Sequence, residues 1–318
     1  MSIIKKITNY LHLHKTIEDV VKFYVENSRE KLQTQIAEMN LALRSAELKH
    51  LALSSTESGI TNDALCDHEV VVSLTTYSKR IHEVYLTIES IMQGTVKPNR
   101  IILWLAEEEF KGKTLPIVLQ NQIKRGLEVR YCKDIRSYKK IIPTLQLCPE
   151  ACIITIDDDT IFEPDVIEHL ITSYKVFPNC VSACRLRKIK TDKNGMPTKY
   201  NNWLLGEYEA FPSHYNFLTS GGGTLFPPHL LHSQVGNEEL FMKLCPTADD
   251  IWLNAMLIIN GTKVVKAFTH NPIGNDFLSN ESLQVNSLWS HNKEDLGNDI
   301  QIKAIWNYFK LADLFKNI

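Results

Sequence analysis

Three consecutive carboxylates, Asp157, Asp158 and Asp159, stand directly after the apolar run 151–156. A short apolar run of this kind is typical of a strand buried on both faces, so the acids would lie where the chain leaves the core. Carboxylates so close together repel one another unless a cation or hydrogen-bond donors compensate their charge. Oxygen ligands suit Mg²⁺ or Mn²⁺, which complete their coordination with water and substrate phosphates. The run therefore predicts a divalent-metal site; the alternative is a solvated turn in which Asp158 or Asp159 caps the next helix.

A second pair of acids, Asp249 and Asp250, begins an apolar helical pattern expected over 247–257. Acids in the first turn of a helix often do no more than complement its dipole. In the other interpretation one of them is a general base that takes a proton from a hydroxyl group. Partial burial and an acidic neighbour would tune the pKa of its carboxylate for this role.

Three consecutive glycines, Gly221, Gly222 and Gly223, lie between the two groups of acids along the chain. Consecutive glycines adopt backbone conformations barred to other residues and let a ligand approach the main chain closely. A plain flexible turn is the alternative.

A parallel sheet is expected to position these residues. Apolar strand-like runs at 69–74, 100–105, 127–132 and 151–156 are spaced by helical patterns. This alternation predicts an α/β fold with a mostly parallel, Rossmann-like sheet and right-handed crossovers. The sequence contains no GxGxxG or Walker motif, which disfavours dinucleotide cofactors and P-loop chemistry.

The ends of the first, third and fourth runs would bring further polar groups to the same edge of the sheet. These groups are hydroxyls, an aromatic ring, a lone carboxylate and cations. Together they suit the binding of a uridine-type nucleotide with its diphosphate. For each lysine taken singly, a solvated helix face is the alternative. The residues are Thr75, Thr76, Tyr77, Arg80, Asp134, Arg136, Lys139 and Lys140.

The N-terminal region follows a different pattern. From 16 to 53 there is neither proline nor glycine, and apolar residues recur every 3.5 to 3.6 positions, which predicts a long amphipathic helix. Self-association as a coiled coil, packing on the following domain and contact with a membrane surface are its three alternatives. We expect a helical segment and linker over 1–60 and a catalytic domain over 61–318, with a nucleotide-binding half at about 68–160 and an acceptor half at about 161–318.

Composition narrows the class of protein. The chain has 318 residues, 44% of them hydrophobic, which is enough for a sizeable core. Its formal net charge is −2 and it contains no basic run, so nucleic acid is not an expected partner. Seven cysteines without a CxxC pair predict buried thiols in a reducing cytosol. We expect neither a signal peptide nor a membrane span.

Taken in order along the chain, the motifs resemble those of nucleotide-sugar-dependent glycosyltransferases of the GT-A fold. Within that fold the chain is similar to family 2-like bacterial enzymes of surface-polysaccharide or lipopolysaccharide assembly. The resemblance covers about 68 to 310. Its motifs are 72–77 with Arg80, 101–110, 134–140, the 157–159 run as DxD, the glycines, and 248–250 as xED.

The resemblance implies roles for individual residues. Asp157 and Asp159 would hold Mn²⁺ or Mg²⁺ against the donor diphosphate, and Asp250 would be the base in an inverting enzyme. Asp249 replaces the usual Glu of xED, which leaves the choice between the two acids open. The glycines would line the donor sugar and the acceptor. The nucleoside and the rest of the donor would be bound by Thr75, Tyr77, Arg80, Asp134, Arg136, Lys140 and Asp158.

A histidine that follows the xED helix often binds metal or phosphate in such enzymes. His270 has this place in the chain and His291 competes with it, although either can equally be a structural histidine.

The expected activity is metal-dependent transfer of a sugar, with inversion, from a nucleotide-diphosphate donor, UDP-linked by resemblance. The acceptor would be a glycan or a lipid-linked glycan of bacterial capsule or lipopolysaccharide synthesis. The expected location is the cytoplasm with peripheral contact at the inner face of the membrane, and the N-terminal helix would support a homo-oligomer. A nucleotidyl- or phosphoryl-transferase, a retaining glycosyltransferase and a scaffold protein with a degenerate catalytic body are the alternatives.

Overall fold

The computed structural model describes residues 3–270, 277–279 and 297–316 of the chain. His291, the competitor of His270, lies outside the described residues. The chain divides into two compact units, Met1–Glu47 and Leu48–Ile318.

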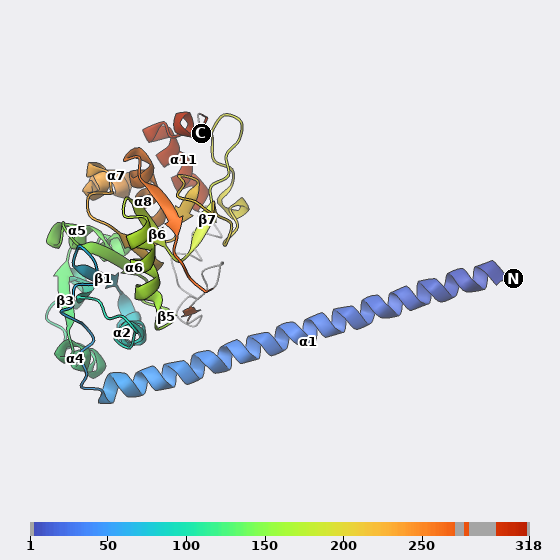
Figure 1. Cartoon of the computed structure of the whole chain (residues 1–318), viewed down its shortest axis with the longest axis horizontal. Helices are drawn as coiled ribbons and strands as arrows, with labels where there is room; N and C mark the ends of the chain where they lie inside the picture. Colours follow the sequence, from blue (N-terminus) through green and yellow to red (C-terminus); the bar gives the residue numbers. More distant parts are fainter. Residues whose placement is uncertain (1–2, 271–276, 280–296, 317–318) are drawn as a thin grey trace. The chain divides into compact units, whose positions relative to one another are not determined.

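The first unit is formed by helix α1 (Ile3–Ser54), 52 residues long, whose last turns belong to the second unit (Figure 1). The helix begins earlier than the sequence pattern suggested, because no proline or glycine interrupts it from its first residue on. Leu48 and Ala52 are fully buried and attach its end to the second unit. The apolar residues expected to form its stripe are exposed where the structure describes them: Val21, Tyr24, Leu32, Ile36, Met39 and Leu43. Coiled-coil self-association therefore stays a prediction.

None of the helices described has the length and apolar run needed to span a membrane.

A seven-stranded sheet organises the second unit, with the strand order β10-β6-β9-β4-β1-β2-β3. Neighbours pair in parallel except β9, which is antiparallel to both β4 and β6. The predicted fold class is confirmed: a mostly parallel α/β sheet flanked by helices and preceded by a long helix. The strands are β1 (Val70–Thr75), β2 (Arg100–Ala106), β3 (Leu127–Cys132), β4 (Cys152–Ile156), β6 (Cys180–Ala183), β9 (Gly222–Phe226) and β10 (Lys263–Lys266).

Two small sheets and short helices complete the described part of the unit. Strand β5 (Thr160–Phe162) pairs with β11 (Phe277–Ser279), and β7 (Leu186–Lys188) pairs with β8 (Asn216–Leu218), both antiparallel. The 3-10 turns are η1 (Ser78–His82), η2 (Arg136–Lys140), η3 (Tyr200–Asn202) and η4 (Ser233–Gly236). The helices are α2 (Val84–Met92), α3 (Glu107–Phe110), α4 (Ile117–Lys124), α5 (Ile142–Leu147), α6 (Val166–Val176), α7 (Glu238–Leu244), α8 (Asp249–Ile259), α11 (Gly297–Phe309) and α12 (Ala312–Phe315).

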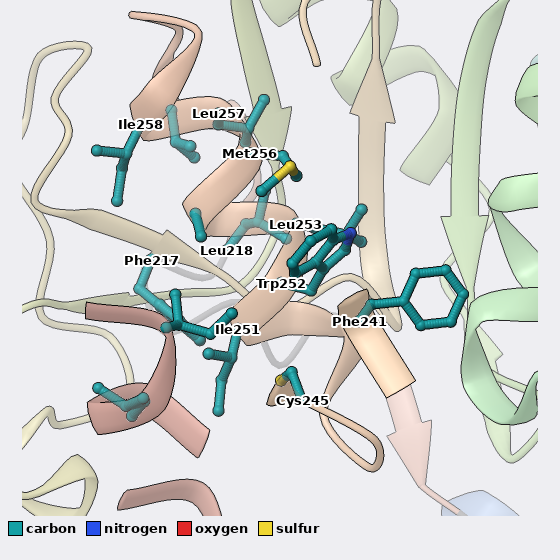
Figure 2. Packing of buried hydrophobic residues seen from close by; sticks show 14 of the residues in the cluster. Phe217, Leu218, Phe241, Cys245, Ile251, Trp252, Leu253, Met256, Leu257 and Ile258 are labelled. Carbon is teal, nitrogen blue, oxygen red and sulfur yellow. The ribbon is translucent and has the colours of Figure 1, made fainter. Parts of the chain in front are cut away.

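Helix α8 is held by a large apolar cluster (Figure 2). Trp252, Leu253 and Met256 are fully buried in it, and Phe241 of α7 meets the Trp252 ring edge to face at 6.0 Å between centroids. Each such side chain contributes about 1.5–3 kcal/mol through burial. This packing fixes the position of α8 in the unit, and with it the position of the two acids at its N-terminal end.

Candidate active site

The three acids after β4 have three different environments. Asp158 is directed inward, where its carboxylate accepts hydrogen bonds from Thr76 Oγ1 at 2.6 Å and from Arg80 Nη1 at 2.5 Å. Arg80 also pairs with Asp159 through Nη2 at 3.1 Å, and the side chains of Arg80, Asp158 and Asp159 are only 11%, 7% and 12% exposed. Arg80 thus compensates the charge of two acids at once.

Burial raises the pKa of Asp158 to about 6, against the opposing effect of Arg80. The pKa of Asp159 is raised as well, by burial and then by the neighbouring charge of Asp157. The charge of Asp157 therefore acts on Asp159, as expected of two neighbouring carboxylates.

Asp157 is the most open of the three, with a side chain 49% exposed. Its Oδ1 accepts a hydrogen bond from Lys140 Nζ at 2.8 Å, and the same ammonium pairs with Oδ2 of Asp249 at 3.1 Å. Burial alone would raise the pKa of Asp157, but the Lys140 charge holds it below its usual value. Lys140, 4% exposed, thus joins the end of β4 to the start of α8.

Asp249 and Asp250 share Ser220, the residue before the glycines. The Ser220 hydroxyl lies 3.1 Å from Oδ2 of Asp249 and 2.6 Å from Oδ1 of Asp250, which also accepts the Ser220 backbone N–H at 2.8 Å. Burial, followed by the charge of Asp249, raises the pKa of Asp250 to about 6. Asp250 is half-buried whereas Asp249 is buried and ion-paired, so Asp250 is the better placed of the two to accept a proton from a substrate.

Two of the three glycines belong to a strand, and Gly221 lies in the turn before it. Gly222 begins β9, Gly221 accepts the Asp157 N–H at 3.1 Å, and Gly223 has a φ of +91°. A Cβ atom on Gly221 would lie 1.7 Å from Oδ2 of Asp157, and one on Gly222 would lie 2.9 Å from Cβ of Arg185. The absence of a side chain at 221 is therefore what leaves space for the Asp157 carboxylate.

The residues expected to contact the nucleoside lie at the ends of β1 and β3. Thr75 donates its hydroxyl to the Trp104 carbonyl at 2.9 Å, and the exposed Tyr77 ring lies 5.2 Å from the Arg80 guanidinium carbon. Asp134 is exposed and pairs with the buried Lys139.

Arg136 is exposed, reaches the Pro246 carbonyl at 3.1 Å and has a φ of +57°. Its donor-binding role stays a prediction, as do the roles of Thr75, Tyr77 and Asp134.

His270 lies against residues that the sequence pattern had not connected with it. Its Nε2 is 2.8 Å from Oδ2 of Asp165, and its ring meets that of His169 edge to face at 4.8 Å. Its assignment as a metal ligand stays a prediction, and these are the groups with which it would bind one.

Arg185 is a residue that the sequence analysis missed. It follows β6, and burial together with the charge of Arg187 lowers its pKa, while the charges of Asp157 and Asp250 act in the opposite direction. A cation near both acids is useful for binding a phosphate-bearing substrate. No motif in the sequence indicates it, because it lies in the short connection between β6 and β7.

A cavity of about 560 Å³ lies elsewhere, lined by Lys188, Lys190, Gly206, Glu207 and Tyr208. None of the predicted site residues lines it. The acids reach solvent mainly through Asp157.

The donor set at the end of β4 fits a hard divalent cation. Asp157 and Asp159 supply oxygen ligands only, the charge of Asp157 raises the pKa of Asp159, and Asp157 is open to solvent. Asp158 is occupied by Thr76 and Arg80, so it is better suited to orienting the run than to binding the ion.

Comparison with known proteins leaves the family open. No family model and no curated protein matches the sequence. Among solved structures, the chain is similar to the mannosyltransferase PcManGT from Pyrobaculum calidifontis in complex with GDP-Man and Mn²⁺, at 12% identity and a TM-score of 0.42. The match covers 73% of this chain and 64% of the other, so the chain spans less than two thirds of that protein. Because the TM-score is this low, the chemistry must be argued from the side chains.

Proposed function

We propose that the chain is a metal-dependent glycosyltransferase that uses a nucleoside-diphosphate sugar. One observation carries the proposal: Lys140 Nζ lies 2.8 Å from Asp157 and 3.1 Å from Asp249. Asp249 shares the Ser220 hydroxyl with the candidate base, Asp250, so the candidate metal ligands and the candidate base surround the same small region. Sugar transfer needs both groups within reach of one substrate, the first at the leaving diphosphate and the second at the attacking hydroxyl.

Asp157 and Asp159 would hold Mn²⁺ or Mg²⁺, and the bound ion would neutralise charge that develops on the leaving diphosphate. Arg80 keeps Asp159 in place, since it pairs with both Asp158 and Asp159. Lys140 and Arg185 add positive charge beside the same acids. Gly221 leaves the carboxylate of Asp157 uncovered by a side chain.

Asp250 is the proposed base. Two hydrogen bonds from Ser220 to Oδ1 orient the carboxylate, and its raised pKa of about 6 is high enough for efficient proton acceptance while leaving it ionised at neutral pH. Oδ1 is thereby occupied by protein donors, and Oδ2 is the atom that would take the proton of the acceptor hydroxyl. A base that activates the acceptor directly gives attack from the face opposite the leaving group, hence inversion.

The finer assignments rest on the sequence resemblance. They are a uridine diphosphate sugar as donor, contacted by Thr75, Tyr77 and Asp134, and a glycan or lipid-linked glycan of the bacterial surface as acceptor. If the acceptor is lipid-linked, we also expect peripheral contact of the protein with the inner face of the membrane.

The test is incubation of the full chain with a panel of nucleoside-diphosphate sugars and Mn²⁺, with the products identified by mass spectrometry. We expect release of a nucleoside diphosphate together with transfer of the sugar, or its transfer to water when no acceptor is present. Release of a sugar phosphate and a nucleoside monophosphate would instead identify a nucleotidyl- or phosphoryl-transferase. Turnover of no donor with any divalent ion would contradict the proposal.

A further inference from the structure

A second group of metal-binding side chains meets at the start of α6. Asp165 directly precedes the helix, His169 lies one turn into it, and His270 comes from the segment after β10. Oδ2 of Asp165 is 2.8 Å from Nε2 of His270 and 3.2 Å from Nε2 of His169. The three ligand atoms all lie within 4.8 Å of one another. Residues far apart in the sequence therefore present one oxygen and two imidazole nitrogens to a common point.

The spacing matches the requirements of a tetrahedral ion. Zn²⁺ binds imidazole nitrogen and carboxylate oxygen at about 2.0–2.2 Å, which places neighbouring ligand atoms roughly 3.3 Å apart. The two separations from Asp165 are already close to this value. His270 has a side chain 76% exposed, so its ring can rotate to adjust the distance between the two imidazoles.

Burial and charge at the group also favour an ion. Nε2 of His169 is buried and makes no aligned hydrogen bond, although it lies near Asp165. A buried ring nitrogen in this state loses its interaction with water without replacement, and a metal would supply one. The Asp165 carboxylate supplies a negative charge within 3.2 Å of Nε2 of both histidines, which a divalent cation would bind directly.

We propose that Asp165, His169 and His270 form a site for a divalent transition metal, Zn²⁺ foremost, with the remaining coordination position filled by water. Two imidazoles select zinc, nickel or copper over magnesium and manganese, which prefer oxygen ligands alone. The site differs in chemistry from the carboxylates of Asp157 and Asp159, and it does not depend on the proposed sugar transfer. An ion here would join the chain after β5 to the chain after β10.

The experiment is a titration of metal-stripped, tag-free full chain with ZnCl₂ against a coloured chelator. We expect the parent chain to bind one Zn²⁺ ion, and we expect His169→Gln and His270→Gln to lower the affinity for it by more than ~100-fold. Even the loss of a group that only orients a metal ligand costs on the order of 10- to 100-fold in affinity. His270→Gln is the decisive variant because an exposed side chain can be replaced without loss of folding. The matched control is His229→Gln, which removes an exposed histidine paired with a single acid, Glu150, at 3.0 Å.

Co²⁺ substitution separates this site from binding by the seven free thiols. A cobalt spectrum with ligand-field bands and no sulfur-to-metal charge transfer is expected, and Asp157→Asn should leave it unchanged. Equal Zn²⁺ binding by the parent chain and His270→Gln, or a sulfur charge-transfer band, would overturn the proposal. So would failure of the parent chain to take up any Zn²⁺, which would leave Asp165 and the histidines as a simple ion pair.

Discussion

Lys140→Met should reveal how strongly one buried ammonium holds the two groups of acids together. The substitution keeps an unbranched side chain, one atom shorter, and removes its charge, which leaves Asp157 and Asp249 without their shared partner. Removing one member of a buried ion pair costs about 3–5 kcal/mol, because the remaining charge stays buried. That figure applies to Asp249, whose side chain is 9% exposed. Asp157 is half exposed and adds no more than about 1 kcal/mol, since solvent screens it.

We therefore expect Lys140→Met to lower the free energy of unfolding by about 3–6 kcal/mol. Urea unfolding followed by tryptophan fluorescence is the assay, because every tryptophan lies in the second unit. The matched control is Lys133→Met, whose pair with Glu238 has side chains 69% and 42% exposed. Solvent screens this pair, so its loss should leave the free energy of unfolding almost unchanged.

The double variant Lys140→Met/Asp249→Asn removes the uncompensated charge as well as its partner. It should be more stable than Lys140→Met alone, by about 1–3 kcal/mol, because no buried carboxylate is left without a cation. A loss below about 1 kcal/mol for Lys140→Met, or strict additivity of the two substitutions, would refute this reasoning.

Three further outcomes test the chemistry. Asp250→Asn should lower kcat by about 10²–10⁴ while donor binding by calorimetry changes little, whereas equal turnover would remove Asp250 as the base. Because burial and Asp249 raise the pKa of Asp250 to about 6, and a base must be unprotonated, kcat/KM should be constant above that pH and fall about tenfold per pH unit below it. Asp249→Asn should move this limb to lower pH, and an unmoved limb would show that another group titrates. Gly221→Ala should abolish metal-dependent donor binding, since its Cβ would lie 1.7 Å from Asp157 Oδ2, whereas Gly236→Ala, with no atom within 4 Å, should leave binding unchanged.

The sequence allowed prediction of the elements better than of their contacts. Apolar runs identified β1, β2 and β4 because strands buried on both faces must be apolar throughout. The edge strand β3 is only partly buried, and polar residues alternate with apolar ones in it. The glycine run was expected as a ligand-lining turn, yet Gly222 and Gly223 lie in β9 between β4 and β6. A strand that begins with two glycines has no recognisable strand propensity, so only the pairing partners determine it.

The side-chain contacts of the candidate site were only partly predictable. Lys139 and Lys140 are neighbours in the sequence, but the first pairs with Asp134 and the second with Asp157 and Asp249. Their 3-10 turn sends adjacent side chains in different directions, and no pattern of residue types records which lysine faces which acid. The Asp165 partner of His270 is likewise determined by the approach of two segments that are distant in the chain.

The central claim is that Asp157 and Asp159 bind a divalent cation that in turn binds the diphosphate of a nucleotide sugar. Isothermal titration of the full chain with a nucleoside-diphosphate sugar, with and without Mn²⁺, tests it most directly, using Asp157→Asn, Asp159→Asn and the exposed control Glu150→Gln. The account predicts donor binding that requires Mn²⁺, is lost in both aspartate variants and is unchanged in the control. Binding of the donor with equal affinity in the absence of any divalent ion, or unchanged binding by the Asp157→Asn protein, would contradict it.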